Sequence, residues 1–352
     1  MTSSSFISLL LISSILVGSH LSLTSAQATP PLVGGLSYNF HSTNCPSLET
    51  TIREYLREIF NSDFGVAAGL LRVHFHDCFV QGCDGSVLLA GSTSGPGEQA
   101  APPNLTLRPR AFVIINELRN RIHRACGAIV SCADITALCA RDAIFLTGGP
   151  DYRVPLGRRD GVTFATINAT LTNLPFFGSR VPTLIDDFAR KNMDITDLVA
   201  LSGGHSIGRA SCPSFVGRLY PTRDPTLETN FGNNLTRVCP TNTSSGLTAL
   251  DVRTPNVFDN QYFVNLVNRQ GLFVSDQDLF TNATTRPIVQ RFANNQTLFF
   301  ERLAFSMIKM GMINVTTGTQ GEIRTNCSAR NTPTSYLTTA VIDDEQGKTA
   351  SY

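Results

Sequence analysis

The cysteines restrict the fold of this chain more than any other feature. There are nine of them, and they are spread over most of the sequence: Cys45, Cys78, Cys83, Cys126, Cys132, Cys139, Cys212, Cys239 and Cys327. In a secreted protein, eight would suit four disulfides and leave one thiol over. Zinc ligation is the alternative, but the chain has no CxxC pair and the spacings are scattered. We therefore expect four disulfides and one free thiol, although spacing alone does not choose the pairs.

The first 26 residues explain how such a chain could reach an oxidising compartment. They contain no Lys, Arg, Asp or Glu, and an apolar run from Phe6 to Val17 is followed by small residues ending at Ser25 and Ala26. This pattern predicts a signal peptide over residues 1–26, although the usual positive start is missing. A membrane anchor is the alternative, but the run is shorter than the ~20 apolar residues that span a bilayer. No later segment is long and apolar enough either, so we expect a soluble product without a membrane partner.

The amino-acid composition is typical of a globular protein. Charged residues make up 16%, the formal net charge is +1, and there are 22 Phe but no Trp. This balance gives no electrostatic reason to expect binding to nucleic acid or to an anionic membrane. The length allows one large domain or two lobes. Acceptor sequences for N-glycosylation agree with secretion; they begin at Asn104, Asn168, Asn234, Asn242, Asn282, Asn295 and Asn314.

Apolar residues recur at helical spacing and predict a mainly α fold. The expected helices span residues 47–61, 64–79, 112–126, 131–146, 181–191, 194–202, 260–270, 285–294 and 299–311, with another after Gly203-Gly204. Asp194 is the expected N-cap of its helix. We expect loops over 91–103, 151–175 and 221–255, no series of hairpins, and a disordered polar tail over 331–352.

The segment from residue 70 to 89 carries an unusual set of side chains. Arg72 and His76 are four residues apart, so a helix places them on one face, with Phe75 beside them. Asp77 follows at once, and then a short loop with Asp84 and Ser86. The pair alone is more often a surface Arg and His at helical spacing. The aromatic residue and the oxygen-rich loop favour a reactive site instead.

Five segments carry a resemblance to a known family: HFHDCF, LSGGHSIG, VPLGRRDG, RTPNVFDNQYF and SDQDLF. Together with eight of the cysteines, they resemble the class III (secretory plant) haem peroxidases. The resemblance implies a two-lobed, mainly α peroxidase domain over residues 27–330. It also implies haem b between a distal and a proximal lobe, and two structural Ca²⁺ ions.

The same resemblance implies a function. H₂O₂ would be reduced to water while small phenolic donors are oxidised by one-electron steps, by a monomer secreted to the cell wall or, alternatively, the vacuole. One alternative is a non-catalytic, calcium-binding wall glycoprotein on the same fold. A second, an intracellular ascorbate-type peroxidase, is opposed by the leader and the cysteines.

Roles for individual residues also follow from the resemblance. His76 would relay a proton, and Arg72 would stabilise developing negative charge. Phe75 would form one wall of the site and limit what reaches the iron. Asn104 would accept a hydrogen bond from His76, and it is expected to remain unglycosylated. On the opposite side His205 would bind the iron and Asp276 would accept its N–H.

Two ion sites, a donor site and the cysteine pairing complete the expectations. The first Ca²⁺ set is Asp77, Val80, Gly82, Asp84 and Ser86, and the second is Ser206, Asp251, Thr254, Val257 and Asp259. Pro155 would lie at the exposed haem edge where phenolic donors dock. The implied disulfides are Cys45–Cys126, Cys78–Cys83, Cys132–Cys327 and Cys212–Cys239, with Cys139 as a buried free thiol.

Overall fold

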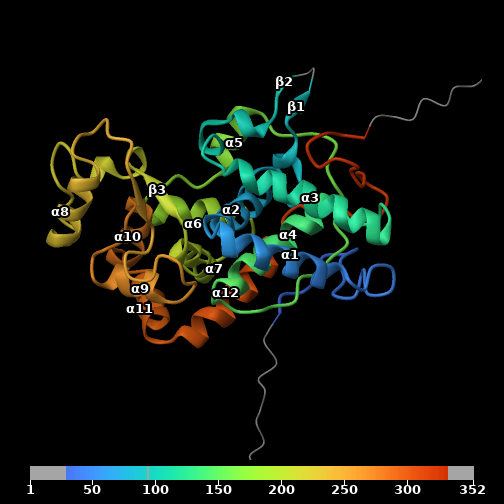
Figure 1. Ribbon diagram of the computed structural model, residues 1–352. Coiled ribbons are helices and arrows are strands. Elements are labelled where there is room, and N and C mark those ends of the chain that lie inside the picture. Colours follow the sequence, from blue (N-terminus) through green and yellow to red (C-terminus); the bar gives the residue numbers. More distant parts are fainter. Residues whose placement is uncertain (1–28, 93–94, 332–352) are drawn as a thin grey trace, which may run out of the picture.

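The computed structural model describes residues 29–92 and 95–331. The expected signal peptide and the tail beyond residue 331 lie outside the described residues. The described chain is predominantly helical, which confirms the mainly α prediction (Figure 1).

Four helices form the N-terminal lobe: α1 (Leu48–Ser62), α2 (Gly65–Val80), α3 (Pro109–Cys126) and α4 (Cys132–Leu146). α4 packs against the other three, and α2 is buried along most of its length. A helix that is buried on nearly all sides rarely carries charged residues unless they are paired or functional. The position of Arg72 and His76 on α2 is therefore informative.

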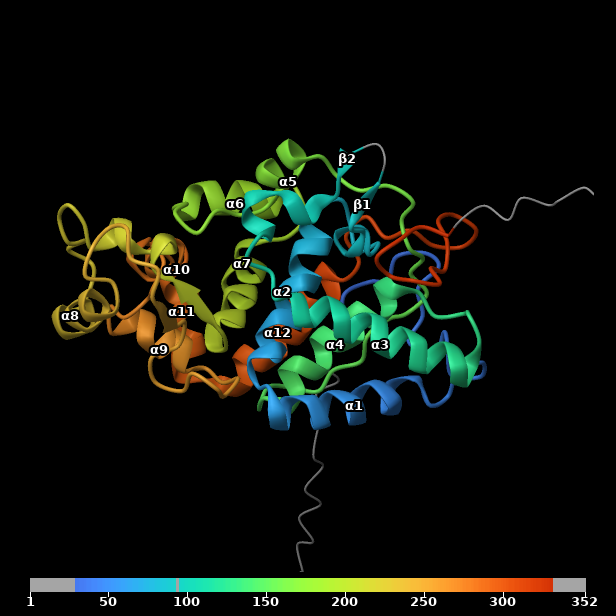
Figure 2. The ribbon, with the colours of Figure 1, turned by 45° about the horizontal axis from the view of Figure 1, so that its top comes forward.

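The C-terminal lobe gathers at the opposite end of the molecule. It consists of α8 (Thr229–Val238), α9 (Gln261–Val267), α10 (Val274–Thr281) and α11 (Arg286–Asn294). Figures 1 and 2 both place these helices on the left and α1, α3 and α4 further right. Between the lobes, α12 (Gln296–Met310) packs against α7 (Ile195–Ser202) and reaches α2. The remaining helices, α5 (Ile167–Asn173) and α6 (Val181–Ala189), lie near the top of the view in Figure 2.

Most predicted helices are present, and Asp194 caps α7 as expected: its Oδ1 accepts the Asp197 N–H at 2.9 Å. The prediction of a helix after Gly203-Gly204 is wrong. A single 3₁₀ turn (Gly203–Ser206) leads instead into strand β3 (Arg209–Ser211). This strand pairs antiparallel with β4 (Leu247–Ala249), with Ala210 opposite Thr248. A second two-stranded sheet joins β1 (Gly91–Ser92) and β2 (Gly95–Pro96).

Three short helices lie where none was predicted. α5 and α8 fall in expected loops, and α10 lies in a segment with no assignment. Isolated helices of this length are unstable, so they depend on caps and tertiary packing more than on a long apolar period. Thr166 caps α5 and Glu228 caps α8 through side-chain oxygens that accept backbone N–H groups. Such support is difficult to see in the sequence.

Four disulfides join the same cysteines that the resemblance pairs: Cys45–Cys126, Cys78–Cys83, Cys132–Cys327 and Cys212–Cys239. The first and third have sequence separations of 81 and 195 residues. On the chain-entropy account each stabilises the fold by roughly 4–5 kcal/mol. Cys139 is a free, fully buried thiol on α4, and burial raises its pKa well above the usual value.

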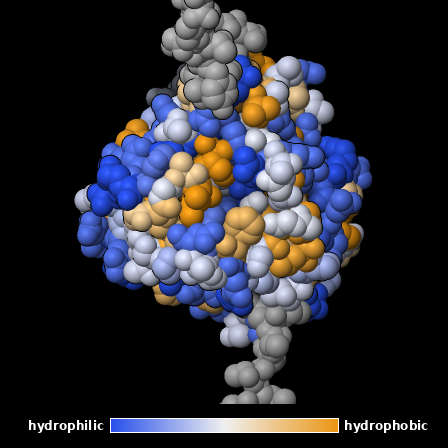
Figure 3. Space-filling model, turned by 90° about the vertical axis from the view of Figure 1, so that its right-hand side faces the viewer, coloured by the Kyte–Doolittle hydropathy of each residue, from blue (hydrophilic) through white to orange (hydrophobic). Residues whose placement is uncertain are grey.

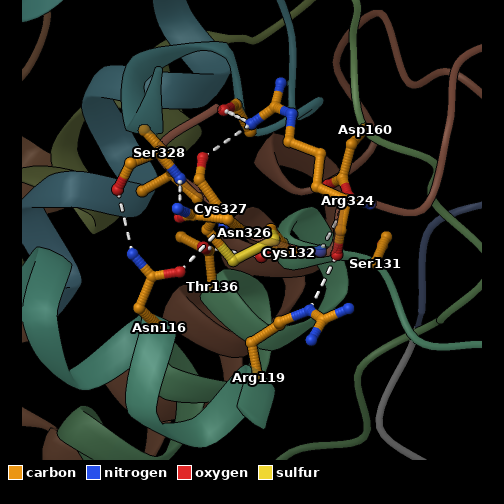
Figure 4. The surroundings of a disulfide bond; sticks show 12 residues. Asn116, Arg119, Ser131, Cys132, Thr136, Asp160, Arg324, Asn326, Cys327 and Ser328 are labelled. Carbon is orange, nitrogen blue, oxygen red and sulfur yellow. Dashed lines mark hydrogen bonds between the residues drawn. A yellow bond between two sulfur atoms is a disulfide. The ribbon is translucent and has the colours of Figure 1, made fainter. Parts of the chain in front are cut away.

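The Cys132–Cys327 disulfide holds the end of the described chain against the N-terminal lobe (Figure 4). Asn116 Oδ1 accepts the Cys327 N–H at 2.8 Å, and Arg119 Nε donates to the Arg324 carbonyl oxygen at 2.7 Å. Asp160 Oδ2 accepts N–H groups from both Cys132 and Arg324. Hydrogen bonds therefore reinforce the link on both sides of the sulfur atoms.

On the face shown in Figure 3, apolar side chains are scattered in small patches among hydrophilic ones. Within the described ranges, the structure has no helix with the length and apolar character needed to cross a membrane.

Candidate active site

The distal cluster consists of Arg72, Phe75 and His76 on α2 and Asn104 at the end of a 3₁₀ turn (Pro102–Asn104). His76 Nδ1 lies 2.6 Å from Asn104 Oδ1, and Arg72 Nε donates to His76 Nε2 at 3.1 Å. The Phe75 ring stands edge-on to the imidazole, with a centroid distance of 5.3 Å. The structure thus brings together the four distal residues that the sequence singled out.

The hydrogen bonds determine which nitrogen of His76 is basic. The Glu98 carbonyl oxygen can only accept, so the Asn104 amide nitrogen must face it, at 2.8 Å. Asn104 Oδ1 then faces His76 and requires a proton on Nδ1. His76 Nε2 consequently carries the lone pair, and Arg72 Nε–H points at it. This is the tautomer that a proton acceptor needs.

Burial keeps His76 neutral. Its side chain is 4% exposed, and desolvation, followed by the charge on Arg72, lowers its pKa to about 3, although the hydrogen bond with Asn104 opposes the shift. Arg72 is held by two further contacts: Nη1 donates to Thr106 and Nη2 donates to the Pro103 carbonyl oxygen at 2.9 Å. A fixed cation therefore stands beside a neutral base.

Asn104 heads a glycosylation sequence, yet its side chain is 3% exposed and both amide atoms are engaged. We expect peptide mapping of the secreted, active protein to find Asn104 unmodified, because a glycan on Nδ2 would displace the Glu98 contact. Exposed Asn168 and Asn234 provide internal controls for the digestion and detection of sequon peptides. A glycan on Asn104 in the active fraction would contradict this geometry.

The proximal pair consists of His205, in the 3₁₀ turn Gly203–Ser206, and Asp276 in the first turn of α10. Their Nδ1 and Oδ1 atoms lie 2.7 Å apart. Burial acts to raise the pKa of Asp276, but His205 and hydrogen bonds from His205, Phe273 and Tyr262 outweigh it and lower the pKa. An ionised Asp276 only accepts, so His205 Nδ1 donates to it, and Nε2 is the ring nitrogen left to face a metal.

Backbone glycines bring the proximal turn against α2. A Cβ on Gly204 would lie 3.6 Å from the Leu71 side chain, and one on Gly208 would lie 3.1 Å from the Ala68 Cβ. Ala68, Leu71 and Arg72 follow one another along a single face of α2. The face of α2 that carries Arg72 therefore packs toward the loop that carries His205.

The loop after α2 brings the first proposed ion set together. Asp77 Oδ2 accepts the Gly85 N–H at 2.9 Å, and Asp84 Oδ1 accepts the Ser86 N–H at 3.0 Å. Burial, then the neighbouring Asp84, raises the pKa of Asp77 well above its usual range. Ser86 Oγ is buried and makes no hydrogen bond of normal geometry to a described residue. A hard cation would offset the repulsion between the carboxylates, and the Ser86 hydroxyl, which lies beside the Glu98 carboxyl, would supply one more oxygen ligand.

The second ion set also converges in space. Thr254 Oγ1 lies 3.4 Å from Asp251 Oδ2 and 3.1 Å from Asp259 Oδ1, and Ser206 Oγ donates to the Asp259 carbonyl oxygen at 2.7 Å. The Val257 N–H bonds the Thr254 carbonyl oxygen at 3.0 Å, which closes the turn. Each of the two sets supplies only two carboxylates. In the described ranges no cluster of three or more His, Cys, Asp or Glu side chains could hold a metal, so carbonyl and hydroxyl oxygens would complete both.

Pro155, the residue expected beside the exposed haem edge, lies inside the fold. It is buried, and its carbonyl oxygen accepts a hydrogen bond from Arg158 Nη1 at 2.7 Å. Arg158 in turn pairs with the fully buried Asp134 at 2.9 Å. The proline is therefore packed inside the protein, and its role beside the exposed haem edge remains a prediction.

Residue-by-residue reasoning missed three contributors to the site: Glu98, Thr106 and Tyr262. Glu98 orients Asn104, and burial raises the pKa of its carboxyl to about 7. Thr106 binds Arg72, and Tyr262 binds Asp276. Thr106 and Tyr262 lie inside segments already singled out, but only the folded chain shows which atoms they contact.

Comparisons with known proteins agree with this geometry. The family model described as "Peroxidase" matches residues 52–295. The chain is 60% identical over 304 residues to Peroxidase 12 of Arabidopsis thaliana, covering 86% of this chain and 84% of that protein. It is 58% identical over 303 residues, with the same coverage, to cationic peroxidase SPC4 of Sorghum bicolor. Peroxidase 42 of Zea mays is 43% identical over 292 residues, 83% of this chain and 89% of that protein.

The fold, the paired histidines and these matches define a haem peroxidase of the plant type. The chain belongs to the peroxidase family, within its secretory class III. Nothing among the relatives supports the non-catalytic alternative.

Proposed function

We propose that this peroxidase reduces H₂O₂ at a haem b held by His205 and oxidises small phenolic donors by one-electron steps. The observation that carries the proposal is the pairing of two histidines in complementary states. His76 presents an unprotonated Nε2 beside Arg72, whereas the Nδ1 of His205 is held by Asp276 and its Nε2 remains available as a ligand. One arrangement suits proton transfer and the other suits metal ligation.

The proximal residues fit a haem. The side chain of His205 is 36% exposed although that of its partner Asp276 is almost fully buried, and His205 Nε2 makes no hydrogen bond to a described residue. Gly203 allows the turn to pack closely, because a Cβ there would lie 2.5 Å from the Phe299 ring. Haem b would supply the iron that takes two oxidising equivalents from peroxide and returns them one at a time.

The distal residues would handle the proton and the charge. His76 Nε2 would accept a proton from one peroxide oxygen and deliver it to the oxygen that departs. The Arg72 guanidinium would stabilise negative charge on the departing oxygen. Asn104 would keep Nδ1 protonated, so that Nε2 remains the basic atom. Phe75 would restrict access from one side.

The ions would hold these residues in place. Asp77 follows His76 directly, and Ser206 follows His205 directly, so each set of oxygen ligands is continuous with one catalytic segment. We expect exhaustive chelation to lower peroxidase activity, shift the Soret band and lower the unfolding temperature, with recovery on adding Ca²⁺ but not Mg²⁺. Unchanged activity and spectrum, with calcium shown absent by atomic absorption, would refute this role.

An exposed aromatic pair supports phenolic donors. Phe176 and Phe177 are 58% and 39% exposed, with ring centroids 4.3 Å apart. Phe177 contacts Phe273 at 5.8 Å, and Phe273 stands edge-on to His205 at 5.4 Å. An aromatic ring that stacks on the pair would therefore dock near the proximal side of the site.

A panel of electron donors tests this proposal. We expect guaiacol-type phenols to be preferred over ascorbate, and the double variant Phe176→Ala/Phe177→Ala to raise the KM for phenols several-fold without slowing the reaction with peroxide. Leu247→Ala, on exposed β4, is the control for loss of surface apolar area. A preference for ascorbate, or an unchanged KM for phenols, would contradict the donor assignment.

Location and assembly remain part of the proposal. We propose a peroxidase domain over residues 27–330 that is secreted as a monomer to the cell wall, with the vacuole as the alternative. Disulfides form in oxidising compartments, and four are present here. The scattered apolar patches on the face in Figure 3 agree with a monomer.

A further inference from the structure

The proximal carboxylate has a second side-chain partner. Tyr262, on α9, donates its hydroxyl proton to Asp276 Oδ1 at 2.9 Å. The same oxygen accepts the His205 Nδ1–H at 2.7 Å. The other oxygen, Oδ2, accepts the Phe273 N–H at 2.8 Å. Two side-chain donors therefore share one carboxylate oxygen, and a backbone group occupies the other.

This contact is built into the core. Tyr262 is 1% exposed, Asp276 is 2% exposed, and the tyrosine ring stands edge-on to His205 with a centroid distance of 5.9 Å. Burial, followed by the charge on Asp276, raises the pKa of Tyr262 well above its usual value. The phenol is therefore a neutral hydrogen-bond donor, and it has no access to water that could replace Asp276.

Sharing one oxygen weakens each of its bonds. A carboxylate oxygen that already accepts a proton from a phenol has less negative charge to attract the imidazole N–H. The more strongly a carboxylate attracts that proton, the more electron density the imidazole gives to a metal on its other nitrogen. The Tyr262 hydroxyl therefore acts against the effect of Asp276.

We infer that Tyr262 is a positioning residue that limits how strongly Asp276 polarises His205, and so sets the reduction potential of the iron that His205 holds. The inference rests on the proposed ligation of haem by His205. The hydroxyl would keep the ferric state from being stabilised too far, while Asp276 still fixes the orientation of the imidazole.

The test compares isosteric side chains in the haem-loaded protein. We expect Tyr262→Phe to shift the ferric/ferrous midpoint potential to a more negative value and to raise the iron–histidine stretching frequency of the ferrous form, because Asp276 Oδ1 then binds His205 alone. Tyr220→Phe is the matched control: its hydroxyl also donates one hydrogen bond, to the Cys239 carbonyl oxygen at 3.0 Å, away from His205. That variant should change neither value.

A second substitution separates hydrogen bonding from packing. 3-Fluorotyrosine at position 262 is a stronger hydrogen-bond donor of nearly the same size, and it should move both values in the direction opposite to phenylalanine. If both variants bind haem and both values equal those of the parent, the inference is overturned. Shifts of the same sign would also overturn it, because packing alone would explain them. A parent protein without an iron–histidine band would instead refute ligation by His205.

Discussion

Replacing His76 with alanine is expected to slow the reaction with H₂O₂ by about 10⁴-fold while haem stays bound. One imidazole both accepts and donates the proton, so its loss removes the general base and the general acid together, and such groups contribute ~10²–10⁴-fold in rate. His205 and Asp276 are untouched by the change, so the proximal side should still hold haem. Stopped-flow mixing with peroxide, normalised to the Soret absorbance, measures the effect.

His74→Ala is the matched control for this prediction. His74 lies on the same helix, is 3% exposed, and contacts the Cys78 sulfur at 3.6 Å instead of the distal cluster. Burial, then Arg158, lowers its pKa to about 3, much as for His76. Peroxide rates within a few-fold of the parent in His74→Ala, against the large loss in His76→Ala, would locate the proton relay. A near-normal rate in His76→Ala would mean that another group carries the proton.

Arg72→Leu is expected to lower the same rate constant by about 10²–10³-fold, the usual effect of removing one preorganised group that stabilises transition-state charge. Leucine keeps much of the apolar stem but removes the charge and the contacts with His76, Thr106 and Pro103. The phenol oxidation steps should change less, since the aromatic pair of Phe176 and Phe177 is unaltered. Single-turnover measurements with peroxide and then with guaiacol separate the two halves of the reaction.

Arg72→Lys sharpens the second prediction. Lysine keeps the charge but cannot bond His76, Thr106 and the Pro103 carbonyl oxygen at once, because it lacks the planar fork of arginine. We expect a rate between those of the parent and Arg72→Leu. If the rate constant of Arg72→Leu with peroxide lies within a few-fold of that of the parent, the guanidinium does not stabilise the departing oxygen. If Arg72→Lys reacts with peroxide as slowly as Arg72→Leu, the planar geometry of the guanidinium contributes more than its charge.

The sequence predicts contacts within this site only where the two residues are close together in the chain. Arg72 and His76 are four residues apart on a helix, so local geometry predicts their shared face. His205 and Asp276 are 71 residues apart, and only the resemblance to a family linked them. Tyr262 stands in a segment quoted for that resemblance, but its bond to Asp276 requires α9 and α10 to pack together.

What sequence reasoning missed also has physical causes. Pro155 lies in a turn-rich segment, and composition could not show that its carbonyl oxygen binds Arg158, which pairs with Asp134. α5 and α8 are short, and caps at Thr166 and Glu228 support them where the apolar period is too brief to predict a helix. After Gly203-Gly204 the chain enters a strand, because β4 offers it a partner nearly 40 residues later.

The central claim is that His205 holds haem while His76 acts on peroxide from the opposite side. Haem content and the ferrous iron–histidine stretching band of three secreted proteins test it directly. The account predicts one haem and the band in the parent and in His76→Ala, and loss of the band in His205→Ala. A band that persists in His205→Ala, or a folded parent that carries no haem, would contradict it.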